Sequence, residues 1–278
     1  MLIIGEAELG RFRAHLFELE YSPATVSKYL HDARALAEYA KGGLLDRGQL
    51  AGFRGWLEAR GYCGASVNSM LGAANRLLAF LGTDWRLRYL RVQRRSFLPA
   101  ARELSQEEYV RMVRTAERRG DRRLAMLTET LCALGLRVSE LKAVTVESLE
   151  AGEANIRNKG KLRTILIPAA LSRKLRAYAR SRGIVSGPLF ITRTGRAMDR
   201  SNIWKMLKRL AALAKVAGEK VFPHNLRHLF ARTHYTRFRD IVRLADILGH
   251  SSVETTRIYT ARSGREERRQ LEQLRLIL

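Results

Sequence analysis

The chain has 278 residues, with 51 Lys and Arg against 27 Asp and Glu and a formal net charge of +24 at pH 7. This length allows two domains with separate cores, and the positive excess favours a polyanionic partner, above all nucleic acid. The apolar run Met1–Ile4 is too short for a secretory leader and no apolar stretch could span a bilayer, so we expect a cytoplasmic protein without membrane partners.

The first predicted elements are four helices between residues 5 and 92. The clearest begins at Ser22 and Pro23, an N-cap followed by a proline at the first helical position, and its apolar residues recur at helical spacing as far as Tyr39. Two more helices each end at a glycine: residues 47–60 before Gly61, and residues 65–81 before Gly82. We therefore predict a helical domain over residues 1–92.

A basic segment follows, and we predict a linker at residues 93–102. Arg94 and Arg95 lie in this segment, which lacks a helical period and contains Pro99. Such a segment either contacts phosphates or is a solvated loop. A capping box at residues 105–108 then marks the first helix of a second domain.

The second domain is predicted to be helical apart from a small β-sheet. Two short apolar runs around a glycine-containing turn indicate a β-hairpin at residues 154–168. A helix at residues 169–182, a short strand at Leu189–Ile191 and helices beyond Ser201 complete the domain. The expected fold class is thus mainly α with a small β-sheet.

No motif for a metal or cofactor is evident in the sequence. Cys63 and Cys132 lie far apart in apolar stretches, without the spacing of a metal site, so we expect both to be buried thiols. The chain has no Gly-x-x-x-x-Gly-Lys-Ser/Thr loop and no evident carboxylate cluster. We expect neither a metal ion nor a cofactor.

Three basic side chains in the second domain are placed as phosphate ligands would be. Arg137 lies at a turn into a short helix, where a planar guanidinium suits two oxygens of one phosphate and Glu140 could brace it. His224 and Arg227 lie three residues apart just after Pro223, on one face of a helix N-terminus that favours anions. Each motif alone is more typical of a surface histidine or a surface ion pair.

Three further side chains could supply proton transfer and attack. Lys159 lies at the hairpin turn, where a long side chain can bring a proton to a leaving oxygen. His250 directly precedes a predicted helix that contains Tyr259. A tyrosine has a reference pKa of about 10, so it needs cationic neighbours or a base to act as a nucleophile, and a single tyrosine is usually structural. Only the whole ordered set indicates phosphodiester chemistry.

Together these motifs resemble those of the tyrosine recombinase family, which includes phage-type integrases, Xer-type dimer resolvases and related transposon integrases. The matching signatures are LRVSEL at residues 136–141, NKGKLR at 158–163, PHNLRH at 223–228, and LGHSS at 248–252 with Tyr259 nine residues after His250. The likeness is close over residues 103–262 and looser over residues 5–95. It implies a core-binding domain at residues 1–92, a linker at 93–102 and a mixed α/β catalytic domain at 103–278.

The resemblance implies a C-shaped clamp on double-stranded DNA in a prokaryotic, DNA-associated protein. Cleavage would need neither metal nor ATP and would leave a 3′-phosphotyrosyl link and a free 5′-hydroxyl. The implied roles are Tyr259 as nucleophile, Arg137 and Arg227 on the non-bridging oxygens, Lys159 as general acid, His224 as general base and His250 as a hydrogen-bonding partner of the transition state.

The hairpin departs from the family pattern, because Asn158 replaces a glycine and the turn is one residue shorter. Lys159 is the predicted general acid, and Lys161 is the alternative. We also predict phosphate contacts for four basic residues on the hairpin and in the linker: Lys161, Arg163, Arg94 and Arg95.

The tail, residues 265–278, has leucines at helical spacing. It either packs on its own domain or, as in relatives, docks on a neighbouring subunit, which would imply a homo-oligomer on DNA with a tetramer in the synaptic complex. The predicted task is integration or excision of a mobile element or resolution of DNA dimers, with accessory DNA-bending or directionality factors as further partners. The alternatives are a type IB topoisomerase and, without enzymatic activity, a DNA-binding module or a decayed recombinase retained for architecture.

Overall fold

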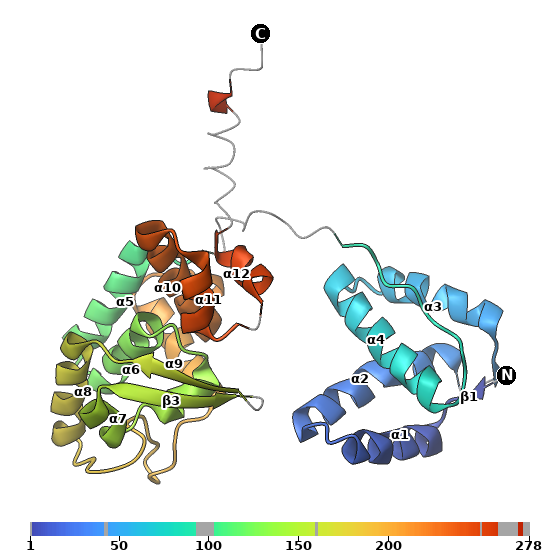
Figure 1. Ribbon diagram of the computed structural model, residues 1–278, viewed down its shortest axis with the longest axis horizontal. Helices are drawn as coiled ribbons and strands as arrows, with labels where there is room; N and C mark the ends of the chain where they lie inside the picture. Colours follow the sequence, from blue (N-terminus) through green and yellow to red (C-terminus); the bar gives the residue numbers. More distant parts are fainter. Residues whose placement is uncertain are drawn as a thin grey trace. The chain divides into compact units, whose positions relative to one another are not determined.

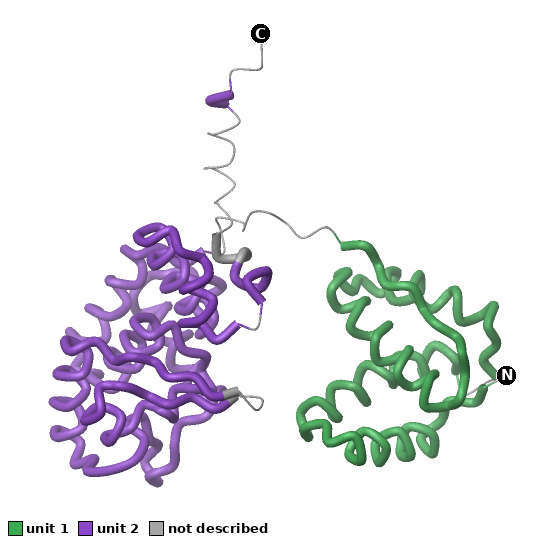
Figure 2. Tube along the Cα trace, in the orientation of Figure 1, with its two compact units in different colours: residues 1–94 green, residues 95–278 purple. Residues whose placement is uncertain are grey.

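The computed structural model describes residues 2–41, 44–92, 103–158, 161–250, 252–260 and 272–274, with the backbone alone for residues 158, 161 and 257–260. Contacts divide the chain into two compact units, Met1–Arg94 and Arg95–Leu278, drawn in green and purple in Figure 2. The predicted linker, with Arg94 and Arg95, lies outside the described residues. Each unit has a hydrophobic core of its own.

Unit 1 contains the four predicted helices (Figure 1). They are α1 (Glu6–Glu18), α2 (Pro23–Ala40), α3 (Arg47–Ala59) and α4 (Gly64–Phe80). Ser22 caps α2 as predicted, since its Oγ accepts a hydrogen bond from the Thr25 N–H at 3.3 Å. The inward faces of the helices meet around three fully buried side chains, Phe12, Phe53 and Leu71.

A two-stranded sheet that we did not predict joins the start of the chain to the segment before α3. β1 (Leu2–Ile3) pairs antiparallel with β2 (Leu44–Leu45), with Leu2 opposite Leu45. Strands of two residues are too short to show the alternation on which strand prediction depends.

Two asparagines of α4 hold the extended segment that follows this helix. Asn75 accepts a hydrogen bond from the Leu87 N–H at 2.7 Å and donates one to the Leu87 carbonyl at 3.0 Å. Asn68 makes the same pair of bonds with Leu90. The segment is thus fixed at two points, and its three arginine side chains remain exposed: Arg86, Arg88 and Arg91.

Unit 2 is mainly helical with one β-hairpin, which confirms the predicted fold class (Figure 1). Its helices are α5 (Gln106–Arg118), α6 (Arg122–Ala133), the 3₁₀ helix η2 (Val138–Ala143), α7 (Val146–Ala151), α8 (Ala169–Ser181), α9 (Arg200–Leu213), the 3₁₀ helix η3 (Gly218–Lys220), α10 (Pro223–Phe238), α11 (Ile241–Leu248) and α12 (Val253–Thr260). No described helix combines the length and apolarity needed to cross a lipid bilayer.

The hairpin consists of β3 (Glu153–Asn158) and β4 (Lys161–Leu166), as the sequence predicted. Side chains alternate along β4, because Leu162 and Leu166 are 69% and 75% exposed whereas Ile165 is 5% exposed and belongs to the core. Arg163, two residues before Ile165, is therefore on the inward face of this strand. The hairpin places a basic side chain toward the interior of unit 2.

Two predictions for individual segments were wrong. Leu189–Ile191 is not a strand, because within it Ile191 alone takes part in an isolated bridge, with Ala197. The adjacent Pro188 bridges to Thr145 but has no N–H with which to extend a ladder. Cys63 is exposed, whereas Cys132 is buried as expected. Cys63 occupies the N-cap of α4, so it precedes the apolar face of that helix rather than lying within it.

Candidate active site

The candidate site lies in unit 2, where helix ends bring together side chains that are far apart in the sequence. Arg137 lies between α6 and η2. The helix α10 begins at Pro223, as predicted, and its first turns carry His224 and Arg227. His250 follows the last residue of α11 by two positions.

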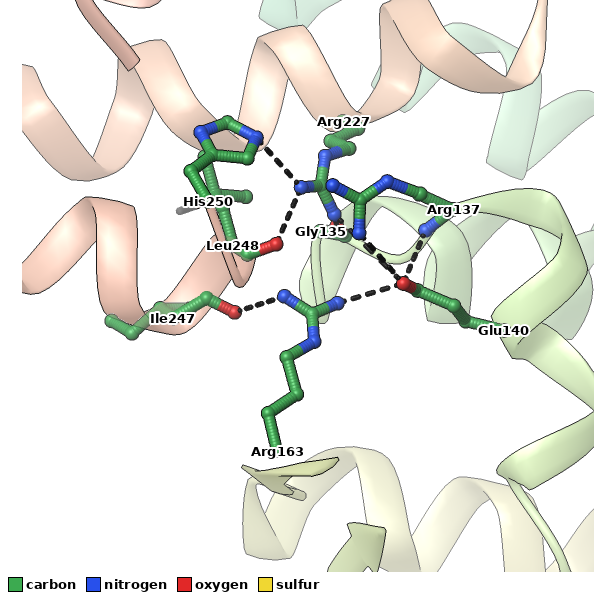
Figure 3. Close-up of polar contacts among 8 residues, drawn as sticks. All are labelled: Gly135, Arg137, Glu140, Arg163, Arg227, Ile247, Leu248 and His250. Carbon is green, nitrogen blue, oxygen red and sulfur yellow. Dashed lines mark hydrogen bonds and ion pairs between the residues drawn. The ribbon is translucent and has the colours of Figure 1, made fainter. Parts of the chain in front are cut away.

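A single buried carboxylate, that of Glu140, gathers three guanidinium groups (Figure 3). Its Oε1 lies 2.8 Å from Arg137 Nη1, and its Oε2 lies 2.7 Å from Arg163 Nη2 and 3.9 Å from Arg227 Nη1. Burial alone would raise the pKa of Glu140, but the hydrogen bonds from Arg137 and the charges of Arg163 and Arg137 outweigh it and hold the pKa below its ordinary value. One ionised carboxylate thus faces three cations, which leaves the cluster with an excess of positive charge.

Arg227 is fully buried, and its donors are directed at backbone carbonyls. Its Nη1 donates to the Gly135 carbonyl at 2.7 Å, and its Nη2 donates to the Leu248 carbonyl at 2.6 Å. Nη2 also lies 3.0 Å from His250 Nε2. Arg227 therefore joins the end of α6, the end of α11 and His250, and the plane of its guanidinium is fixed by these bonds.

Gly135 allows this arrangement through its backbone. Its φ is +57°, and a Cβ at this position would lie 2.5 Å from Cδ1 of Phe230 on α10. Only glycine combines that conformation with so close an approach. The glycine that precedes the LRVSEL motif thus presents its carbonyl to Arg227 without displacing Phe230.

His250 is held in one tautomer by its two neighbours. Because a guanidinium can only donate, Nε2 accepts from Arg227, so Nδ1 carries the proton and donates to Thr256 Oγ1 at 2.8 Å. Burial, followed by the charge of Arg227 and of other guanidinium groups, lowers the pKa of His250 to about 4. His250 is therefore neutral at pH 7. Thr256 is fully buried on α12, so the same hydrogen bond connects the site to the helix that contains Tyr259.

His224 and His228 lie on one face of α10, with ring centroids 4.6 Å apart and the rings edge to face. Burial, with added effects from nearby cationic groups, lowers the pKa of both imidazoles, to about 3 for His228. His224 nevertheless keeps an exposed edge, whereas His228 is half-buried. A neutral and accessible imidazole at residue 224 is able to accept a proton.

Besides Arg94 and Arg95 in the linker, three predicted site residues have no described side chain. Lys159 lies outside the described residues, and Lys161 is described only by its backbone in β4. Tyr259 lies in α12, which contacts α10 and α11, but its side chain is likewise outside the described part of the structure. The backbone thus places Tyr259 on a helix that packs beside the residues around His250.

Arg163, for which we predicted a phosphate contact, extends from β4 into the cluster (Figure 3). Its side chain is 14% exposed, and its Nη1 donates to the Ile247 carbonyl at 2.7 Å. We did not predict that contact or the hydrogen bond that His250 donates to Thr256. The signal available for Arg163 was its spacing of two residues from Ile165, which places both on one face of the strand.

The arrangement suits the stabilisation of a phosphoryl transition state. Charge that develops on phosphate oxygens is stabilised by fixed donors that need no reorganisation when it appears. Arg137 is 33% exposed at its side chain and can reach such a group while Glu140 braces it. Among the described residues, no three His, Cys, Asp or Glu side chains converge as a metal site would require.

Comparison with known proteins agrees with the motifs. The sequence profile of the phage integrase family matches residues 102–266. The tyrosine recombinase XerA of Thermococcus kodakarensis is 33% identical over 268 residues, which cover 92% of this chain and 91% of that protein. The tyrosine recombinase XerD of Vibrio cholerae is 30% identical over 267 residues, which cover 88% of this chain and 87% of that protein.

The fold is also similar to that of solved recombinases. The XerH site-specific recombinase bound to a palindromic difH substrate, in a post-cleavage complex, superposes with a TM-score of 0.71 at 21% identity and covers 91% of this chain and 80% of that one. A lambda integrase tetramer bound to a Holliday junction gives a TM-score of 0.71 at 16% identity, over 93% of this chain and 78% of that one.

Proposed function

The chain belongs to the phage integrase family of tyrosine recombinases, and we propose that it cuts and rejoins double-stranded DNA at specific sites through a 3′-phosphotyrosyl intermediate. Membership rests on the profile match over residues 102–266 and on 33% identity to a tyrosine recombinase over 92% of the chain. Integration or excision of a mobile element and resolution of DNA dimers are the candidate tasks. The Xer relatives favour the second.

Tyr259 is the proposed nucleophile. Its phenolic oxygen bonds to phosphorus while the bond from phosphorus to the 5′-oxygen breaks. His224 takes the phenolic proton, and Lys159, with Lys161 as the alternative, gives a proton to the leaving oxygen. Attack of a 5′-hydroxyl on the phosphotyrosine reverses the step. Because each step exchanges one phosphodiester for another, rejoining requires no ATP.

The gathering of three guanidinium groups by Glu140 is the observation that carries this proposal. We assign Arg137 and Arg227 to the two non-bridging oxygens of the scissile phosphate. Arg227 is fully buried, so the entering phosphate has to replace part of its present contacts. The 3.0 Å contact with His250 is shorter than another of its side-chain contacts, the 3.9 Å ion pair with Glu140. Nε2 of His250 then no longer accepts from Arg227, and it can donate to a phosphate oxygen once it carries a proton.

Double-stranded DNA and further copies of this chain are the proposed partners. The similar XerH structure contains its difH substrate, and the similar lambda integrase structure is a tetramer on a Holliday junction. By analogy, unit 1 is the core-binding domain, unit 2 is the catalytic domain, and the active assembly is a tetramer. Arg94, Arg95 and Lys161 remain proposed phosphate contacts, and accessory bending or directionality factors remain predicted partners.

Covalent trapping tests the proposal. A DNA site is first selected from a random duplex library by binding to the full chain, and a nicked suicide duplex is built on it. The wild-type protein should form a covalent complex that survives denaturing electrophoresis. The fragment that carries the 5′-hydroxyl dissociates from the nicked duplex, so it cannot attack the phosphotyrosine and reverse the step. Tyr259→Phe should form none and should bind the same duplex with unchanged affinity.

Two outcomes would contradict the proposal. Covalent complex with Tyr259→Phe would remove that residue from its role. A wild-type protein that binds the selected duplex without any covalent product, and without nicking it, would show a DNA-binding protein without recombinase chemistry. Relaxation of supercoiled plasmid at random sites by the monomer would identify a topoisomerase instead.

A further inference from the structure

Arg163 extends from the hairpin and contacts two other parts of the site, Glu140 on η2 and the end of α11. It lies on the inward face of β4, opposite Ile156 in the register of the hairpin. Nη2 of this side chain is 2.7 Å from Glu140 Oε2, and Nη1 is 2.7 Å from the Ile247 carbonyl. One guanidinium thus bonds to η2 and to the end of α11, while its own backbone belongs to the hairpin that contains Lys159 (Figure 3).

The carbonyl that Arg163 holds is close to His250. The last carbonyls of a helix have no partner within the helix and are open to outside donors. Arg163 takes the carbonyl of Ile247, and Arg227 takes that of Leu248. Two arginines therefore hold consecutive residues at the end of α11, only two or three positions before His250.

Gly249 has no side chain, and this leaves room for Arg163. A Cβ at residue 249 would lie 2.6 Å from Cδ, 2.8 Å from Nη1 and 3.0 Å from Nε of Arg163, and the φ of Gly249 is +64°. The first of these distances is too short for any side chain at residue 249 to coexist with Arg163 in its observed place. The glycine of the LGHSS motif and the arginine of the hairpin therefore form a matched pair.

We propose that Arg163 is a positioning residue, which fixes Glu140 behind Arg137 and the turn that presents His250, and that Gly249 is required to accommodate it. This replaces the phosphate contact that we predicted for Arg163, because its two terminal nitrogens are bonded within the protein and its side chain is 14% exposed. The inference rests on the proposed function, since it concerns the same site.

The first test compares cleavage rate with DNA affinity. The variants are Arg163→Ala, Arg163→Lys and, as control, Arg111→Ala. Arg111 also donates to carbonyls at the end of a helix, those of Ala214 and Lys215 after α9. Neither of these partners belongs to the site. Single-turnover formation of the covalent complex and the Kd are measured on the same nicked duplex.

A positioning role predicts that Arg163→Ala lowers the cleavage rate about 100-fold, as expected when catalytic groups shift by about 1 Å. The Kd and its dependence on salt should stay within about twofold of the wild type. Arg163→Lys should be nearly as slow, because an ammonium cannot bridge Glu140 and Ile247 with the same fork. Added methylguanidinium should restore part of the rate of Arg163→Ala, and Arg111→Ala should cleave at the wild-type rate.

A phosphate contact predicts the opposite pattern. Loss of one contact weakens binding and lowers the slope of log Kd against log salt by about 1. That result, with an unchanged cleavage rate at saturating DNA, would overturn the inference. Wild-type cleavage by Arg163→Ala would do the same. If the wild-type protein itself formed no covalent complex, the proposed function would fall first, and the role of Arg163 with it.

The second test is a double-substitution cycle with Gly249→Ala. In the wild-type background this change should lower the cleavage rate by a factor similar to that of Arg163→Ala, because the new methyl group displaces the arginine. In the Arg163→Ala background it should lower the rate little further. Gly120→Ala is the control for backbone strain alone, since Gly120 has a φ of +71° and no atom within 4 Å of an added Cβ. Multiplicative effects of the two substitutions would show that Gly249 and Arg163 act independently and would contradict the pairing.

Discussion

The arginines around Glu140 in unit 2 lie in an environment opposite to that of the exposed arginines of unit 1. In unit 1, Arg11 and Arg34 form ion pairs while their side chains stay 69% and 58% exposed. In unit 2, Arg163 and Arg227 are 14% and 0% exposed and share the carboxylate of Glu140. The same residue type therefore serves two purposes in one chain.

The difference indicates which property each unit contributes. Exposed cations attract a polyanion over a distance, and that attraction is screened by salt. Buried cations act over bonding distances, keep their geometry before the ligand arrives, and need a carboxylate to offset the cost of burial. Substitutions in unit 1 should therefore alter affinity, and substitutions in the cluster of unit 2 should alter rate and stability.

Arg227→Ala should give the largest effect. The fixed guanidinium stabilises the charge of the transition state, so we expect the single-turnover cleavage rate to fall by about 10³-fold or more. Arg227→Lys should restore little, because an ammonium cannot reproduce the planar set of bonds to Gly135, Leu248 and His250. Rates on the nicked duplex check this, and cleavage within tenfold of the wild type would remove Arg227 from the site.

Glu140→Gln should destabilise unit 2 and leave unit 1 unchanged. The substitution keeps the shape of the side chain but leaves the buried guanidinium groups without their anion, a change that we expect to lower the free energy of unfolding by about 3 kcal/mol. Hydrogen exchange followed by mass spectrometry reports the two units separately. Equal protection of unit 2 peptides in variant and wild type would contradict the importance of the carboxylate.

Low pH should also weaken unit 2. The pKa of His250 is lowered to about 4 and that of His228 to about 3. Just below pH 6.5 both histidines are therefore still neutral in the folded protein, whereas the same histidines in the unfolded chain are becoming protonated. Stability from these groups is complete above pH 6.5 and is lost as the pH falls toward those values. With a discount for partial exposure, we expect a loss of about 1 kcal/mol by pH 5. Urea unfolding at pH 7 and pH 5 measures it, and a stability that does not change would refute the neutral state of these histidines.

Arg86→Ala combined with Arg88→Ala should give the smallest effect and one confined to binding. Both side chains are exposed on the segment that Asn75 holds through Leu87. If each contacts one phosphate, the slope of log Kd against log salt should fall by about 2, with an unchanged cleavage rate at saturating DNA. The matched double lysine variant should keep the wild-type slope. A slower cleavage step in the alanine variant would contradict the assignment of affinity to unit 1 and of cleavage rate to unit 2.

Local signals made most of the fold predictable. The N-cap and proline at Ser22 and Pro23 predicted α2, and the apolar runs around Lys159 and Gly160 predicted the hairpin. β1 and β2 could not be predicted, because strands of two residues have no period. The error at Leu189–Ile191 arose because a short apolar run resembles a strand until its hydrogen-bond partners are known.

The sequence predicted several residues that the structure brings together, but not the contacts that connect them. Arg137, Arg227 and His250 were chosen from their motifs, and the structure brings all three to one cluster. That Arg227 would be fully buried, and that Arg163 would turn inward, depend on contacts between residues far apart in the sequence. Strand alternation could have indicated the inward direction of Arg163, but the prediction followed its basic neighbours and gave a phosphate contact.

Identification of the covalent adduct tests the central claim most directly. The trapped complex is digested with nuclease and protease, and the modified peptide is sequenced by mass spectrometry. The account predicts a nucleotide joined through its 3′-phosphate to Tyr259, and a free 5′-hydroxyl on the released strand. An adduct on another residue, or a 5′-phosphate link, would contradict it.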